Sequence, residues 1–122
     1  MIITGVICAK GRTGFYFDDQ KAIKLGAHTD GAAYVGKPVT EGYTKIRAAG
    51  EAIRVMLVLE NGAVAHGDCA AVQYSGAGGR DPLFLAESFI PVIEGPVAEH
   101  LIGRELTSFR ELAEEIDHMT VD

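Results

Sequence analysis

Two alternating stretches in the middle of the chain, joined by Asn61-Gly62, constrain the fold more than any other feature of the sequence. Over residues 53–60 every second residue is apolar on one face, which is the period of a half-buried strand. Asn-Gly is the strongest signal for a two-residue type I′ turn. We therefore predict a β-hairpin in which residues 63–71 run back along residues 53–60, with Leu59 opposite Val64.

The N-terminal segment supplies the expected third strand. Residues 2–9 are rich in Ile, Val and Cys, which favours a strand. Because an isolated hairpin is only marginally stable, this strand is predicted to complete a three-stranded antiparallel sheet. Gly11 and Gly14 are then expected to turn the chain into a short helix over residues 17–24, with Asp18 or Asp19 near its start. Residues 26–42 are predicted to form a long loop.

The last third of the chain has helical periodicity. Apolar residues recur at helical spacing from Leu85 to Leu101, and Pro91 and Pro96 are expected to kink or split that segment. Gly103 is expected to end it. A last helix is predicted to begin with a capping box formed by Ser108 and Glu111. Its apolar stripe is predicted to consist of Phe109, Leu112, Ala113 and Ile116.

Strands followed by helices define an α+β domain. The 122 residues are enough for one domain, with strands and loops over residues 1–82 and a helical part over residues 83–122. The net charge of −6 argues against nucleic acid as a partner. No apolar run approaches the length of a membrane span, and the N-terminus lacks a signal-peptide pattern. Cys8 and Cys69 are expected to be buried thiols in a cytoplasmic protein, with a single bridge left open.

Two groups of residues could form a functional site, but a structural explanation is simpler for each. Residues 76–79, Gly-Ala-Gly-Gly, lack the sixth-position glycine of a dinucleotide fingerprint, because that position is Asp81, so a tightly folded or flexible loop is expected. His66 and Asp68 share one strand face while Cys69 points to the other. Two ligands fall short of a zinc site, so buried, hydrogen-bonded polar groups are predicted there.

Gln73 and Tyr74 are the polar residues best placed to bind a ligand. They stand where the predicted strand enters the glycine-rich loop, and rigid scaffolds often hold binding groups at such ends. The residues do not form a complete catalytic set, so the pattern by itself names no reaction.

Five segments of the chain together carry a family resemblance. They are GFYFDDQKAIK at 14–24, HGDCAAVQYSGAGGRDPLFLA at 66–86, FIPVIE at 89–94, LIGRE at 101–105 and AEEIDHMTV at 113–121. In these segments the chain resembles the N-terminal region of the methylaspartate ammonia-lyase family, within the enolase superfamily. The resemblance implies an N-terminal capping domain that precedes a C-terminal (β/α)-barrel, and the chain ends at Asp122, before such a barrel.

The resemblance also implies a function. It implies a cytoplasmic carbon–nitrogen lyase of amino-acid degradation and glutamate fermentation, which interconverts threo-3-methylaspartate with mesaconate and ammonia. The barrel, in the same or a separate chain, would supply both catalytic bases and the carboxylates that hold Mg²⁺, with the metal acting as a Lewis acid. No catalytic residue or metal ligand is therefore expected in this chain, which alone is expected to be inactive, and a homodimer is expected.

The implied task of the cap is to close the active site and shape specificity. Gln73 matches the family glutamine that lies near the alkyl and amino groups of the substrate. Further candidates in the cap loops are Phe15, Tyr16, Asp18, Tyr74 and Arg80. Two alternatives stay open: a free-standing binding or regulatory module derived from the cap, and the cap of a lyase for a different amino acid.

Overall fold

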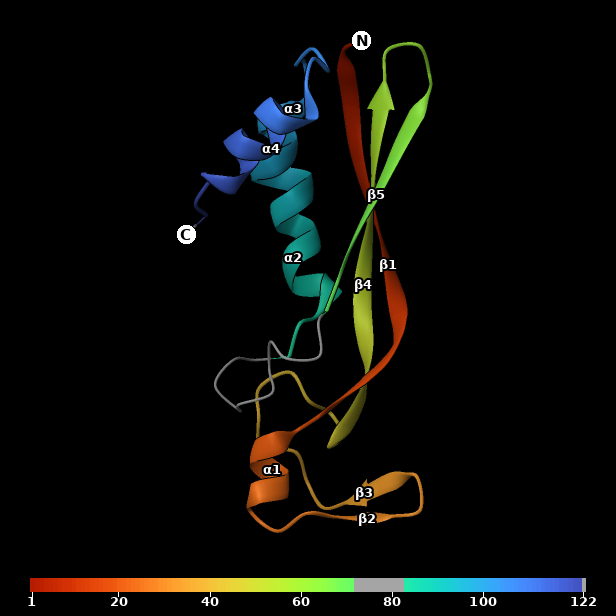
Figure 1. The fold of residues 1–122 in the computed structure, drawn as a ribbon, viewed down its shortest axis with the longest axis vertical. Helices are drawn as coiled ribbons and strands as arrows, with labels where there is room; N and C mark the ends of the chain where they lie inside the picture. The colour runs from red at the N-terminus through yellow and green to blue at the C-terminus, as the bar shows by residue number, and fades with distance from the viewer. Residues whose placement is uncertain (72–82, 122) are drawn as a thin grey trace. The chain divides into compact units, whose positions relative to one another are not determined.

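A computed structural model describes residues 1–71 and 83–121 of the chain (Figure 1). Its described residues divide into two compact units. The first unit holds residues 1–10, 53–69 and 87–121, and the second holds residues 11–52, 70–71 and 83–86. No helix among the described residues is long and apolar enough to cross a membrane.

The three-stranded antiparallel sheet is confirmed. It consists of β1 (Ile3–Asp18), β4 (Arg47–Leu59) and β5 (Val64–Ala70), in the order β1-β4-β5 with β4 in the centre. The predicted turn at Gly11 and Gly14 is wrong, because β1 continues through both glycines, and neither has a positive φ. Pairing with the long central strand holds this glycine-containing segment extended.

The hairpin forms where the sequence predicts it, but its turn is different. The N–H of Gly62 donates to the carbonyl of Leu59 (2.9 Å), and the N–H of Leu59 donates to the carbonyl of Ala63 (2.9 Å). Gly62 has φ +84° whereas Asn61 has no positive φ, so the type I′ turn is wrong. The loop is a type I turn closed by a glycine bulge, and the Asn61 side chain accepts the N–H of Ala63 (2.9 Å).

This turn shifts the hairpin register by one residue. Leu59 lies opposite Ala63 instead of Val64, and further along the hairpin Arg54 lies close enough to Asp68 for an ion pair (3.3 Å). A slip of one residue moves every side chain of the returning strand to the other face of the sheet. His66 and Asp68 therefore share a face with Arg54, away from Leu57, which packs into the core.

The core of the first unit lies between the sheet and the helices. Ile3, Leu101 and Leu112 are buried there, with Leu57 and Val97 among the half-buried side chains packed against them. The helical segments are α2 (Ala86–Val92), a π-helical turn η1 (Ile93–Val97), α3 (Ala98–Leu101) and α4 (Phe109–Asp117). Figure 1 shows the helical segments of this unit along one face of the strands.

The helical path continues through both prolines, so the predicted split into separate helices does not occur. Pro91 lies inside α2 and Pro96 lies inside the π-helical turn. Proline has no N–H to donate and its ring crowds the preceding turn, and a π-helical turn is one way for a helix to absorb such a defect. Gly103, with φ +90°, follows the end of α3, so the predicted stop is confirmed.

The last helix begins with the predicted cap. The Ser108 side chain accepts the N–H of Glu111 (3.4 Å). The Glu111 carboxylate accepts the Thr107 hydroxyl (3.2 Å), whereas a full capping box would return it to the backbone of Ser108. Phe109 is 88% exposed, so its predicted place in the apolar stripe is wrong, and Leu112 is the buried residue of this helix.

The second unit contains a short helix and a small hairpin. Asp19 caps α1 (Gln20–Lys24), which confirms an aspartate at the helix start. The predicted long loop is partly wrong, because it contains β2 (His28–Asp30) paired with β3 (Ala33–Val35). Gly31 supplies a φ of +64° in the two-residue connection, as a type II′ turn requires at that position.

The second unit has its own core. Phe17, Tyr43, Ala71 and Leu83 are buried together. Gly50 allows Phe17 to pack closely across β4, because a Cβ at that position would lie 2.7 Å from the Phe17 ring. This core joins the end of β1 to both sides of the 72–82 segment.

Candidate functional site

Two of the candidate residues are exposed aromatic side chains near the end of β1. Phe15 is 62% exposed and Tyr16 is 65% exposed, whereas the next residue, Phe17, is 4% exposed. Phe17 fixes this part of the strand in the core of the second unit. The strand therefore presents Phe15 and Tyr16 to the outside on an anchored backbone.

Asp18 is held in a network with Arg47 and Tyr34. The Arg47 guanidinium donates to both carboxylate oxygens of Asp18, from Nε (2.7 Å) and from Nη2 (3.0 Å). The same guanidinium lies 4.9 Å from the centroid of the Tyr34 ring, and the Tyr34 hydroxyl donates to Asp18 (3.5 Å). The hydrogen bonds that Arg47 donates to Asp18 raise the pKa of Arg47, so the guanidinium stays charged. The bidentate pair joins β1 to β4, and Tyr34 adds β3 to this network.

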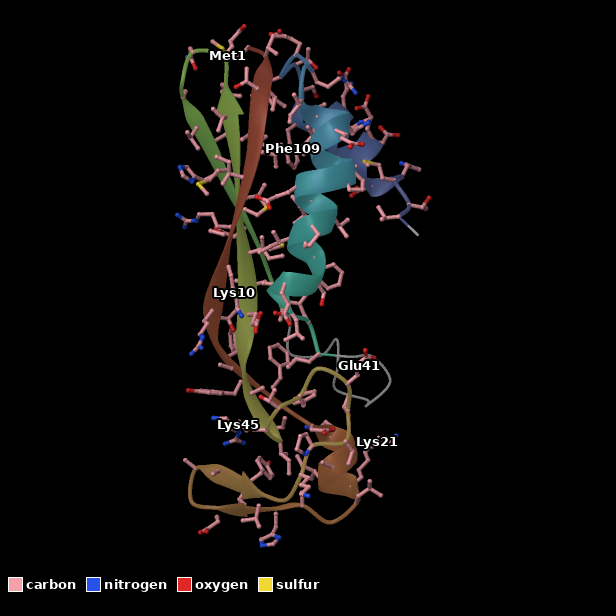
Figure 2. All side chains as sticks on the ribbon, turned by 180° about the vertical axis from the view of Figure 1, so that it is seen from behind. Met1, Lys10, Lys21, Glu41, Lys45 and Phe109 are labelled. Atoms are coloured by element: carbon pink, nitrogen blue, oxygen red, sulfur yellow. The ribbon has the colours of Figure 1, made fainter. Side chains whose placement is uncertain are left out.

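A hollow of about 310 Å³ adjoins this network. Its lining comes from β1, the β2–β3 hairpin and the start of β4, and consists of Tyr16, Ala32, Ala33, Tyr34, Lys45, Ile46 and Arg47. Lys45 stands just before β4 (Figure 2). The hollow combines two aromatic rings with two cationic side chains, one of which is already paired with Asp18.

Asp19 points away from Asp18 and has a structural task. It is 1% exposed and accepts four hydrogen bonds, from the Thr40 hydroxyl (2.5 Å) and from the N–H groups of Val39 (2.7 Å), Thr40 (3.0 Å) and Ala22 (3.3 Å). Burial by itself would raise the pKa of Asp19, but these hydrogen bonds, the Thr40 hydroxyl first, hold it below its ordinary value. The two adjacent carboxylates diverge, as expected.

Gln73, Tyr74, Arg80 and the glycine-rich run at 76–79 lie outside the described residues. The residues on either side of that segment are anchored. The N–H of Ala71 donates to the carbonyl of Glu51 (3.0 Å), and the N–H of Leu83 donates to the carbonyl of Glu41 (3.1 Å). Gly42 packs so tightly that a Cβ there would lie 3.0 Å from the Leu83 Cβ. Gln73 thus follows a fixed, buried residue by two positions.

The residues His66, Asp68 and Cys69 do not form a buried cluster. All three are exposed in β5, so the prediction of buried polar groups is wrong, because β5 is an outer strand whose residues are exposed on both faces. Asp68 pairs with Arg54 on the open face of the sheet.

Cys69 is exposed and Cys8 is half-buried, so the prediction of buried thiols is also wrong, and neither cysteine forms a disulfide. Burial, Glu94 and Cys69 raise the pKa of the Cys8 thiol.

A third polar cluster joins α3 and the residues just after it to α4. Glu115 of α4 accepts hydrogen bonds from Arg104 (2.8 Å) and lies 3.0 Å from His100 Nε2. The hydrogen bonds from Arg104 and then His100 lower the pKa of Glu115. Within residues 1–71 and 83–121, no three His, Cys, Asp or Glu side chains gather closely enough to hold a metal ion.

Sequence reasoning missed Arg47, Tyr34 and Thr40. Arg47 lies 29 residues from Asp18, and Thr40 lies 21 residues from Asp19, so no local spacing connects them. The Asp30-Gly31 dipeptide was the available signal for the hairpin that carries Tyr34.

The described fold and site define a small α+β domain whose second unit anchors the end of β1 and the residues on either side of the 72–82 segment in one core. Residues 1–122 match the family model described as methylaspartate ammonia-lyase N-terminus. The chain is 66% identical over its whole length to methylaspartate ammonia-lyase from Clostridium tetanomorphum, of which it covers 30%. The chain therefore belongs to the methylaspartate ammonia-lyase N-terminal family.

Solved structures agree with this assignment. The chain superposes with a TM-score of 0.91 on the crystal structure of beta-methylaspartase from Clostridium tetanomorphum in its magnesium complex, at 66% identity, covering 100% of this chain and 30% of that one. It superposes with a TM-score of 0.87 on methylaspartate ammonia lyase from Citrobacter amalonaticus containing (2S,3S)-3-methylaspartic acid, at 55% identity, covering 99% of this chain and 29% of that one. The chain thus spans about a third of the length of these relatives.

Proposed function

We propose that residues 1–122 form the capping domain of a carbon–nitrogen lyase that interconverts threo-3-methylaspartate with mesaconate and ammonia. The observation that carries this proposal is the 66% identity to a methylaspartate ammonia-lyase over the entire chain. Because the relatives are about three times longer, the proposal assigns the chemistry to a C-terminal (β/α)-barrel. The barrel lies in the same or a separate chain.

The cap would contribute two segments to the closed active site. One carries Phe15, Tyr16 and Asp18 at the end of β1, and the other carries Gln73, Tyr74 and Arg80. The core formed by Phe17, Tyr43, Ala71 and Leu83 supports the proposal, because it ties the first segment to both sides of the second. Segments attached to one rigid base can close together over a barrel and exclude water.

Gln73 is the residue proposed to bind the substrate. Its amide offers two donors and an acceptor, which suit an amino or carboxylate group in a site with little water. It carries no charge, so it orients the substrate and leaves proton abstraction to the barrel. Asp18 has a different task in this proposal, because Arg47 occupies both of its oxygens. It fixes the strand that presents Tyr16.

Magnesium is proposed for the complete enzyme, with ligands from the barrel. The crystallised Clostridium relative is a magnesium complex. The described residues of this chain do not fit such a site, since none of their acidic side chains converge in a group of three. When bound by the barrel, the metal would act as a Lewis acid on the substrate carboxylate.

The oligomeric state, the compartment and the metabolic role of the enzyme are also proposed. We propose a homodimer that acts in the cytoplasm, in amino-acid degradation and glutamate fermentation. The two unpaired thiols, neither of them fully buried, support a reducing compartment.

A domain replacement tests the proposed function. This chain would take the place of the matching N-terminal part of the Clostridium tetanomorphum enzyme, and the formation of mesaconate from threo-3-methylaspartate would be followed by its ultraviolet absorbance. The parent enzyme is the positive control, and the isolated chain is expected to be inactive. Turnover by the hybrid supports the proposal. A folded hybrid that turns over only another amino acid favours a lyase of different specificity, and a folded inactive hybrid favours a free-standing binding module.

A further inference from the structure

The hollow beside Tyr34 is lined by cationic and aromatic side chains. It lies within the second unit, and its volume of about 310 Å³ falls at the lower end of the range for small-molecule sites, roughly 300–1,000 Å³. Lys45 and Arg47 are cationic, and none of the described residues that line the hollow is acidic. The whole chain carries a net charge of −6, so this is a cationic spot in an acidic chain. Such a lining favours a small anion.

One of the two cationic charges is uncommitted. Arg47 donates to both carboxylate oxygens of Asp18, which balances its charge. Lys45 is exposed, and it makes no hydrogen bond or ion pair with another described residue. Figure 2 shows Lys45 just before β4, apart from Lys21 of α1. The ammonium group of Lys45 is therefore available to a ligand in the hollow.

The aromatic side chains supply a wall and a further donor. The Tyr34 ring lies 4.9 Å from the Arg47 guanidinium, which fixes both groups on one side of the hollow. Tyr16 is exposed, and within the part of the chain that the structure describes its hydroxyl has no hydrogen-bond partner. A phenolic hydroxyl can donate to a carboxylate. Lys45 and Tyr16 thus offer hydrogen-bond donors to two carboxylate groups of one small molecule.

The same groups disfavour a ligand that carries an ammonium group. Asp18 is the acidic side chain nearest in this network, and both of its oxygens accept hydrogen bonds from Arg47. One of these oxygens also accepts the Tyr34 hydroxyl (3.5 Å). A ligand ammonium would therefore be desolvated without a free acceptor and would lie beside the like charge of Lys45. Unpaired polar groups of this kind are how a site rejects a close analogue.

We propose that this hollow binds a small dicarboxylate that carries no ammonium group, held by Lys45 and Tyr16 beside the Arg47–Asp18 pair. The choice of ligand rests on the proposed function: mesaconate, the product of that reaction, belongs to this class, and threo-3-methylaspartate does not. An accumulating product would thus bind the cap itself, next to the segment that presents Tyr16.

A titration followed by nuclear magnetic resonance tests the site. The ¹⁵N-labelled 122-residue chain would be titrated with mesaconate at constant ionic strength. We expect saturable shifts of the amides of residues 16, 32–34 and 45–47, which line the hollow, with a dissociation constant on the order of 1 mM. Threo-3-methylaspartate and inorganic phosphate are the comparison ligands, and each should bind about tenfold more weakly.

Substitutions of lysine assign the binding to one side chain. Lys45→Gln should weaken mesaconate binding about tenfold, and Lys45→Arg should restore most of it, because it keeps the charge. Lys21→Gln is the matched control, since it removes the same charge from the same unit away from the hollow, and it should leave binding unchanged. Equal losses for the two glutamine variants would overturn the proposal.

Three other results would also overturn it. They are the absence of saturable shifts at the hollow, equal binding of mesaconate and threo-3-methylaspartate, and equal binding of mesaconate and phosphate. These outcomes are distinct from those of the domain replacement, because they concern binding to this chain without turnover. Mesaconate binding at the hollow supports the site even where the hybrid enzyme is inactive, and an active hybrid does not rescue the site if no binding is seen.

Discussion

Replacing Asp19 tests how the second unit is held together. Asp19→Ala removes the acceptor for the Thr40 hydroxyl and for three backbone N–H groups, from Ala22, Val39 and Thr40. Loss of a helix N-cap alone costs about 1 kcal/mol. Hydrogen bonds to a charged group contribute about 1.5–3 kcal/mol each, and they do not add fully when one side chain makes them all. We expect the free energy of unfolding to fall by about 3 kcal/mol.

Urea unfolding followed by tyrosine fluorescence measures this loss. The chain has no tryptophan, and Tyr16, Tyr34 and Tyr43 all lie in the second unit. Asp30→Ala is the matched control, because Asp30 is an exposed aspartate of the same unit, and it should change stability by no more than about 0.5 kcal/mol. Equal losses for Asp19→Ala and Asp30→Ala would refute the reasoning.

The same aspartate predicts a pH dependence. Its pKa is lowered in the folded chain, so its contribution is fully present above the unfolded value, ordinarily 3.8, and is lost as the pH falls through the lower folded value. The difference in stability between wild type and Asp19→Asn should therefore be constant near neutral pH and shrink below about pH 4. A difference that grows on acidification would contradict this sign.

Three further substitutions probe the packing. Gly50→Val places a side chain against the Phe17 ring and should cost about 1–3 kcal/mol in urea unfolding, and a neutral effect would contradict the close approach. Leu112→Ala opens a cavity in the core of the first unit and should cost about 2–4 kcal/mol in urea unfolding followed by circular dichroism, more than Phe109→Ala, whose side chain is exposed. Arg47→Lys loses the bidentate geometry with Asp18 and should lower the thermal midpoint, and an unchanged midpoint would show that the pair contributes nothing.

Local signals predicted much of the fold. Four features depend on residues close in sequence, and each lies where expected. They are the hairpin, the helix start at Asp19, the cap at Ser108 and the helix stop at Gly103. The turn type did not follow from the sequence, because Asn-Gly suits both a type I′ turn and a type I turn with a glycine bulge. The second turn adds one residue to the loop, and that residue reverses the faces of β5.

The rest of the fold and site depends on contacts distant in sequence. Gly11 and Gly14 resemble turn residues, but pairing with β4 keeps them in a strand. Asp18 was a candidate from the family resemblance, yet its partner Arg47 comes from another strand, and no spacing rule connects the two. Gln73 was singled out by its place after a strand, and it follows the anchored Ala71 by two positions.

Kinetics of the hybrid enzyme test the central claim most directly. The ratio of kcat/KM for threo-3-methylaspartate to that for a bulkier N-substituted or 3-alkyl analogue would be measured with this chain as the cap, with and without Gln73→Ala. We expect turnover by the parent hybrid, a loss of about 10- to 100-fold for methylaspartate in the variant, and a ratio shifted toward the bulkier analogue. A folded hybrid without lyase activity, or an unchanged ratio in the variant, would contradict the account.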